Sequence, residues 1–211
     1  MLYKYLSHQD KAYFLHIAQL LSLIDKPLLR DGSKPERSAT PLNSPPSSAP
    51  GQTKGENKDA DKARPSGTGA IIGIQRGEPE AALLQEWSCD GDLSDWSVNR
   101  IEEHWLEKLR AAPPELVDDA VTRATLAHET LHVLLNERKY KPSSAPSVSK
   151  LMMFELMRLA LADGNISNVE YHFLSKFKHL CQLDDYIFRD LLERAESTHR
   201  EAQKTLALIL E

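Results

Sequence analysis

An apolar pattern with the period of a helix lies near the beginning of the chain. After Ser7, a residue type that often caps a helix start, apolar side chains recur every three or four positions until Pro27, which cannot continue a helix. They are Phe14, Ile17, Ala18, Leu21 and Ile24. This spacing predicts one helix between Ser7 and Pro27.

The pattern stops near residue 32 and resumes near residue 79. Residues 33–78 are rich in Pro, Ser, Gly, Lys and Asp, and apart from a short patch at residues 71–74 they hold almost no large apolar side chains. Such a segment cannot bury enough apolar surface to offset the entropy lost on ordering, so we expect a disordered linker. Because a long flexible loop adds little closure entropy, residues 1–32 and 79–211 are expected to form one domain.

Helical periodicity dominates the remainder of the chain. The expected helices cover residues 80–87, 95–109, 115–138, 148–162, 168–181 and 184 onward. No segment alternates apolar and polar residues convincingly, which predicts that the fold has no sheet. The sequence therefore predicts an all-α fold, a compact bundle of about seven helices with a long disordered insertion.

A short motif recurs where helices end. Residues 89–94 read CDGDLS and residues 162–167 read ADGNIS, and a shorter Asp-Gly step stands at Asp31 and Gly32. A purely structural explanation is available, because Gly is common just past a helix end and Ser167 with Glu170 has the spacing of a capping box. On this explanation the motif joins two packed helices and binds nothing.

The same connectors could instead form a shallow divalent-cation site. Carboxylate and amide oxygens are the ligands that Ca²⁺ and Mg²⁺ prefer. The candidates are Asp163, Asn165 and Glu170 on one connector and Asp90 and Asp92 on the other. An EF-hand is excluded, because that loop needs Gly at its sixth position and Glu at its twelfth.

The connector also carries a resemblance to a known family. Residues 151–196 and, less fully, residues 6–32 resemble the TerB-like family of tellurite-resistance and co-chaperone domains. In that family an apolar helix ends in Ala-Asp-Gly, followed by a hydrophobic-Ser step and a Glu that enters the next helix. The matching positions are Ala162, Asp163, Gly164, Ile166, Ser167 and Glu170.

The resemblance implies a compact bundle of about seven helices with an internal pseudo-repeat. It also implies a non-catalytic role in a stress or defence response, with metal ions and partner proteins as ligands. Peripheral association with a membrane surface is a further implication of the resemblance.

One motif favours an enzyme instead. His128, Glu129 and His132 form HExxH within an expected helix, where residues four apart share a face and both imidazoles can bind one Zn²⁺. Glu129 would then be the general base of a zinc metallopeptidase, with Glu155 or Glu170 as third ligand. One alternative is a zinc site on the same histidines without catalysis. The other is that both histidines simply lie at the edge of the core, beside Ala127 and Leu131.

Composition narrows the class of protein. The chain of 211 residues has a formal net charge of −5, whereas general nucleic-acid binders usually carry a basic excess, so no nucleic acid is expected. No apolar stretch approaches the ~20 residues of a membrane span, and charged residues interrupt the N-terminal apolar segment as a signal peptide would not. We therefore expect a cytoplasmic protein, with Cys89 and Cys181 as reduced thiols.

Overall fold

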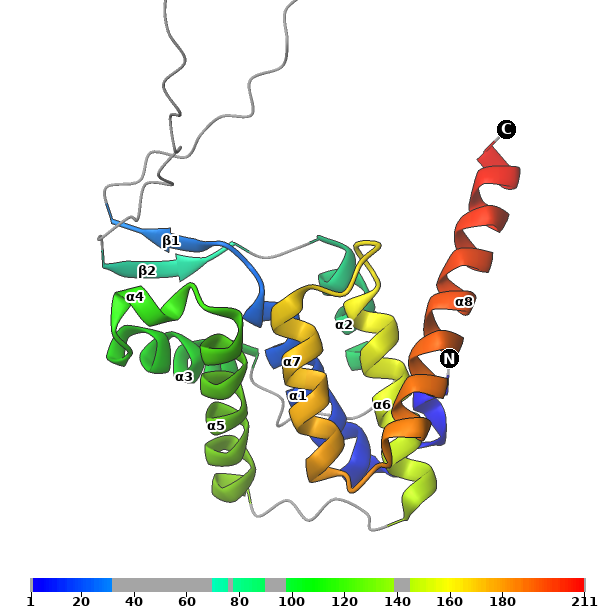
Figure 1. Ribbon diagram of the computed structural model, residues 1–211, viewed down its shortest axis with the longest axis horizontal. Helices are drawn as coiled ribbons and strands as arrows, with labels where there is room; N and C mark the ends of the chain where they lie inside the picture. The colour runs from blue at the N-terminus through cyan, green and yellow to red at the C-terminus, as the bar shows by residue number, and fades with distance from the viewer. Residues whose placement is uncertain (1, 32–69, 76–77, 90–97, 139–144, 211) are drawn as a thin grey trace, which may run out of the picture.

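The computed structural model describes residues 2–31, 70–75, 78–89, 98–138 and 145–210, without the side chains of residues 78–79, 88–89, 98–99 and 137–138. Within these residues the chain forms a mostly helical bundle (Figure 1), which confirms the predicted all-α class. The helices are α1 (His8–Ile24), α2 (Glu78–Cys89), α3 (Val98–Ala111), α4 (Pro114–Val117), α5 (Ala120–Arg138), α6 (Pro146–Ala160), α7 (Asn168–Leu180) and α8 (Asp185–Leu210). A 3-10 helix (Tyr3–Tyr5) precedes them.

The first long helix, α1, is the centre of the core. Ser7 caps it as predicted, because the Ser7 Oγ accepts a hydrogen bond from the backbone N–H of Asp10 at 3.2 Å. Nearly every side chain from Tyr13 to Ile24 is buried, and the helix contacts α2, α3, α5, α6 and α7. A helix that is apolar on all sides is stable only when its neighbours surround it. The N-terminal segment is therefore an integral part of the bundle.

Aromatic side chains join this helix to the elements on either side of it. The rings of Phe14 and Trp87 meet edge to face with centroids 5.0 Å apart, and Tyr3 lies 5.4 Å from Phe14. Trp105, on α3, is also fully buried. Large aromatic residues dominate the energetics of a core of this kind, so they connect the N-terminal segment to the later helices.

A small sheet corrects one prediction. Strands β1 (Leu28–Arg30) and β2 (Ile71–Ile74) pair antiparallel, with Leu28 opposite Ile74. Residues 71–74 were expected to lie in the disordered linker, and no sheet was expected at all. The strands are too short to show alternation in the sequence, and 40 residues separate them. The rest of the expected linker, residues 33–69 and 76–77, falls outside the described residues.

The helix expected at residues 115–138 is divided into α4 and α5. The division lies at Asp118 and Asp119. The Asp119 carboxylate accepts hydrogen bonds from the backbone N–H of Thr122 at 2.8 Å and from its hydroxyl at 2.7 Å. This side chain therefore caps the start of α5, as Asp commonly does.

The last helix, α8, extends well past the end of α6, as Figure 1 shows at the right of the bundle. It packs on α6, and its buried residues are Phe188, whose ring contacts Tyr171 of α7, and Ala195. All residues from 201 to 210 are exposed. In the part of the chain that the structure describes, no helix is long and apolar enough to cross a membrane.

Candidate functional site

The connector between α6 and α7 has the local structure that its sequence predicts. Gly164 has a φ of 105°, a conformation that side chains with a Cβ rarely adopt. The capping box is confirmed: the Glu170 carboxylate accepts from the Ser167 N–H at 2.8 Å, and Ser167 Oγ accepts from the Glu170 N–H at 3.3 Å. The connector is thus held at both ends by its own residues.

The three cation candidates on this connector face different surroundings. Asp163 and Asn165 are exposed, and the Asn165 N–H donates to Asp163 Oδ1 at 3.4 Å. Glu170 is 2% exposed and points into the bundle. Asp90 and Asp92, the candidates on the other connector, lie outside the described residues. The structure therefore does not assemble the predicted set of five ligands.

Two acidic side chains that sequence reasoning missed lie beside this connector. Asp25 directly follows α1, and Glu80 is the third residue of α2. Electrostatic interactions couple Asp25 to Glu80, Asp163 and Glu170. We call these four carboxylates, Asp25, Glu80, Asp163 and Glu170, the acidic junction.

Burial and mutual repulsion perturb the acids of this junction. Burial, followed by the charges of Asp25 and Asp163, raises the pKa of Glu170 to about 8, against the lowering effect of its hydrogen bonds with Ser167. Burial also raises the pKa of Asp25, and the charges of Glu80 and Asp163 add to it while Lys26 opposes it. At neutral pH the acidic junction therefore holds at least one proton that an exposed acid would release.

Two basic side chains enter the acidic junction. The Lys26 ammonium donates a hydrogen bond to Glu80 Oε1 and lies 3.4 Å from Asp25 Oδ1, within ion-pair distance. Burial lowers the pKa of Lys26, but the bond to Glu80 and the charges of both acids outweigh it, and the pKa is raised. Arg123, on α5, is also buried and donates from Nη2 to the Lys26 carbonyl at 2.8 Å. Lys26 thus pairs with Asp25 and Glu80, and Arg123 interacts electrostatically with Asp25.

The acidic junction joins two units of the same design. In each, an Asp follows an apolar helix and a Glu is the third residue of the next helix: Asp25 and Glu80 around α1 and α2, Asp163 and Glu170 around α6 and α7. We call these two helix–connector–helix segments the first and the second unit. Asp31, in the shorter Asp-Gly step, takes no part in this arrangement: it is exposed, and its N–H donates to the Ala70 carbonyl beside the sheet.

The four acids offer ligand atoms that suit a hard divalent cation, but the spacing of their side chains does not form a metal site. All four acids offer oxygen ligands, which Ca²⁺ and Mg²⁺ prefer to nitrogen or sulfur. Among the described residues, however, no three His, Cys, Asp or Glu side chains lie close enough together to hold a metal ion. A cation at the acidic junction would require its side chains to move together.

The two histidines of HExxH lie on one face of α5, as expected. The rings of His128 and His132 are 4.6 Å apart, centroid to centroid, and Glu129 is exposed with Lys108 at 3.8 Å. The Nε2 of His128 is buried and has no hydrogen-bond partner among the described residues. Burial, and then the charges of His132 and Lys176, lower the pKa of His128. The positive charge of Lys176 works against a metal cation at this point.

The third ligand expected for zinc is engaged elsewhere. Glu155 is fully buried on α6, where its carboxylate accepts from the Leu2 N–H at 2.6 Å and from Arg158 at 2.9 Å. Glu170 belongs to the acidic junction. The structure therefore brings the two histidines together but does not join either glutamate to them in a metal site.

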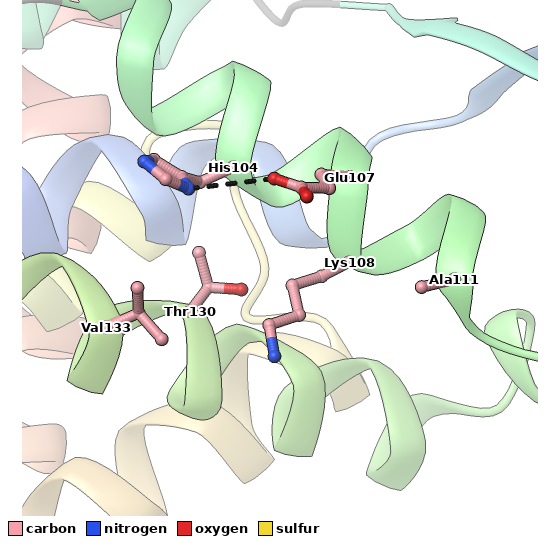
Figure 2. Close-up of a pocket in the computed structure, with 6 residues that line it drawn as sticks. All are labelled: His104, Glu107, Lys108, Ala111, Thr130 and Val133. Atoms are coloured by element: carbon pink, nitrogen blue, oxygen red, sulfur yellow. Dashed lines mark ion pairs between the residues drawn. The ribbon is translucent and has the colours of Figure 1, made fainter.

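A shallow cleft of about 330 Å³ lies beside this face, between α3 and α5 (Figure 2). Its lining residues are His104, Glu107, Lys108, Ala111, Thr130 and Val133. His104 Nδ1 faces Glu107 Oε2 at 4.0 Å, and the Lys108 ammonium points toward α5, where it meets Glu129. Lys108 and Glu129 thus form an ion pair beside this cleft.

Of the two cysteines, the structure describes the side chain of Cys181 only. This thiol is free and half-buried. Burial raises its pKa to about 11, although a hydrogen bond with Ser149 opposes the effect. A thiol with so high a pKa is a poor nucleophile at neutral pH.

Comparisons with known proteins identified no relative of this chain. The sequence matches no protein-family model and no curated protein, and no solved structure matches it significantly.

Proposed function

We propose that this chain is a non-catalytic, TerB-like binding domain that responds to a divalent cation, Ca²⁺ or Mg²⁺, at the acidic junction. On this proposal, binding or release of the cation at the acidic junction changes the surface that the bundle offers to protein partners in a stress or defence response. The single observation that carries the proposal is the convergence of acids from two helix–connector–helix units on Asp25.

The chemistry of the acidic junction supports a cation rather than a catalytic role. Like charges buried together are unfavourable unless a cation or a proton compensates them. Here four acids face two basic side chains, and Glu170 holds a proton up to about pH 8. A divalent cation would replace that proton, because a ligating carboxylate must be ionised. Binding is therefore expected to be tighter at pH 8.5 than at pH 6.5.

Titration with Ca²⁺ and Mg²⁺ tests the proposal. The wild-type protein, freed of metal with a chelator, is titrated calorimetrically beside Asp163→Asn and the control Glu196→Gln. The control removes one exposed carboxylate of α8, far from the acidic junction in sequence. Binding that is present in wild type and control but weakened in Asp163→Asn supports the proposal. The absence of binding to wild type for both cations overturns it.

A second candidate function is zinc peptidase activity at HExxH. What favours it is the contact between the two imidazoles and the buried, unpartnered His128 Nε2 in the described part of the chain. Glu129 is the candidate base, but its partner Lys108 and the missing third ligand weigh against it. Near-stoichiometric zinc in wild type that is lost in His132→Ala, with peptidase activity lost in Glu129→Gln, would favour this candidate over the first.

A further inference from the structure

We propose that residues 199–209 of α8 form an interface with the same residues of a second copy of this chain, packed antiparallel. This proposal goes beyond the proposed function and does not depend on the acidic junction. It begins from residues 201–210, which are all exposed and extend past the end of α6 (Figure 1). Leu206 is 51% exposed, Ile209 72% and Leu210 80%. Apolar side chains gathered at such exposure are unfavourable in water and mark a surface that a partner covers.

The exposed residues continue the face by which α8 packs on the bundle. Residues on this face recur in alternating steps of four and three positions, and all except His199 are apolar. They are Phe188, Leu192, Ala195, His199, Ala202, Leu206 and Ile209. The first three are packed against the core, whereas the last three are exposed. An average spacing of about 3.5 residues is the repeat by which one helix packs along another. The packing face of α8 therefore continues beyond the bundle in a form that suits a second helix.

We call the four positions from residue 199 onward, His199, Ala202, Leu206 and Ile209, the α8 stripe. Their charged neighbours favour an identical partner. Glu201 and Lys204 form an ion pair at 3.0 Å within one helix, and they are the only charged residues of the exposed segment 201–210. Arg200 lies two positions before Ala202, and therefore on the other side of the helix. No like charges meet across the stripe of two copies, whereas a strongly acidic or basic partner would find no opposite charge there.

The α8 stripe is complementary to itself when two copies run antiparallel. In that arrangement Ala202 of each copy lies opposite Leu206 of the other, and His199 lies opposite Ile209. A small side chain thus meets a large one, as close packing between helices requires. The same contacts occur twice, related by the two-fold axis that is usual in a homodimer. In a parallel pair Ala202 would face Ala202 and leave a gap, so the sequence of the stripe favours the antiparallel arrangement.

Sedimentation equilibrium of the whole chain, over an about hundredfold range of concentration, tests the proposal. Leu206→Glu is compared with the matched control Leu208→Glu. Both changes place the same charge on an exposed leucine, and Glu is a good helix former. Residue 208, however, lies two positions after Leu206 and off the stripe. At the lowest concentration the three proteins should melt at the same temperature, because both leucines are exposed in a single chain.

We expect the average mass of wild type and Leu208→Glu to rise from one chain toward two as concentration increases. Leu206→Glu should weaken the dimer by about tenfold or more, because it places a charge in the centre of the stripe in both copies. A mixture of Leu206→Glu with Ala202→Lys tests the orientation. Each variant alone should be a weaker dimer than wild type, whereas the mixture should recover association, since residues 206 and 202 face each other only in an antiparallel pair.

The remaining outcomes contradict the proposal. A wild-type chain that stays monomeric at every concentration overturns it, and binding of that chain to vesicles of phosphatidylcholine and phosphatidylglycerol would assign the exposed residues to a lipid surface instead. Equal loss of the dimer in Leu206→Glu and Leu208→Glu would mean that the end of α8 associates without regard to the stripe. A dimer of Leu206→Glu as strong as that of wild type would place the interface elsewhere. A mixture that does not recover association rules out the antiparallel arrangement.

Discussion

Replacing Glu170 by Gln is expected to stabilise the domain increasingly between about pH 5 and about pH 8 and to leave it nearly unchanged below about pH 5, where the wild-type side chain is protonated in both the folded and the unfolded state. Gln retains an oxygen that can accept from the Ser167 N–H, so the capping box of α7 is preserved. It removes the ionisation that burial and the charges of Asp25 and Asp163 oppose. The substitution therefore isolates the effect of a negative charge at this position.

The expected magnitude follows from the pKa of Glu170. The side chain is protonated up to about pH 8 in the folded protein, whereas its ordinary pKa is 4.5. Between these values the folded state binds more protons than the unfolded state, so stability is greatest below pH 4.5 and falls until about pH 8. At about 1.4 kcal/mol per unit of pKa difference, the loss amounts to about 3–5 kcal/mol. Typical domains have a total stability of about 5–15 kcal/mol, so the effect is measurable.

Groups other than Glu170 also contribute to the pH dependence of the wild-type protein. Asp25, whose pKa is also raised, adds a loss of the same sign, and His128, whose pKa is lowered, adds a gain as pH rises. Both remain in the variant. The difference between the two unfolding curves, rather than either curve alone, therefore reports Glu170.

Urea unfolding at pH 5, 7 and 9, followed by helical circular dichroism in the presence of a chelator, measures this difference. The control is Glu196→Gln, an exposed position on α8 where the same chemical change should have little effect at any of these pH values. A variant at Glu170 whose stability falls with pH as steeply as that of wild type would refute the reasoning. It would mean that the Glu170 carboxyl is ionised in the folded state like any surface acid.

Three further outcomes are expected. Gly164→Ala should destabilise the domain by about 1–2 kcal/mol in urea unfolding, because its φ of 105° is unfavourable for a residue with a Cβ, and an unchanged midpoint would contradict this. Gln182→Gly should instead stabilise it by roughly 0.5 kcal/mol, since Gln182 is exposed with a φ of 53°, and a measurable loss of stability would contradict the strain. Deletion of residues 201–211 should leave the thermal midpoint almost unchanged, because residues 201–210 are all exposed, whereas a large fall would show that the end of α8 stabilises the bundle.

Local signals explain why most helices could be predicted. Ser7, Ser167 and Glu170 cap their helices with the spacing that sequence rules describe, and each forms the expected hydrogen bond. The apolar residues of α1 are buried as their periodicity indicates. These features depend on residues within a few positions of one another, so a single sequence contains them in full.

Features that depend on distant residues were predicted less well. Strand β2 exists because its residues pair with Leu28–Arg30, and Arg110 of α3 donates to the Ile71 carbonyl at 2.9 Å. Neither partner is near residue 71 in the sequence. In isolation the patch at residues 71–74 is too short to distinguish a strand from a loop. Tertiary pairing therefore determined its conformation.

Only two of the four residues of the acidic junction were predicted, for the same reason. Asp163 and Glu170 stand on one connector and were found by their spacing, whereas Asp25 and Glu80 are brought together only when α1 and α2 pack. A signal was nevertheless present, since an Asp at the end of an apolar helix is followed in both units by a Glu in the first turn of the next helix.

The two connectors have different consequences for ligand binding because of Lys26. Its ammonium compensates the buried Glu80 and Asp25, so removing it from the acidic junction sacrifices an interaction that stabilises the fold. On the proposed function, any cation that enters must compete with this interaction, which lowers its affinity. A site of reduced affinity is filled or emptied by changes in cation concentration, whereas a tight structural metal site would stay filled. On the proposed function, the ion pairs of Lys26 therefore favour a cation that binds reversibly at the acidic junction over a permanent structural metal.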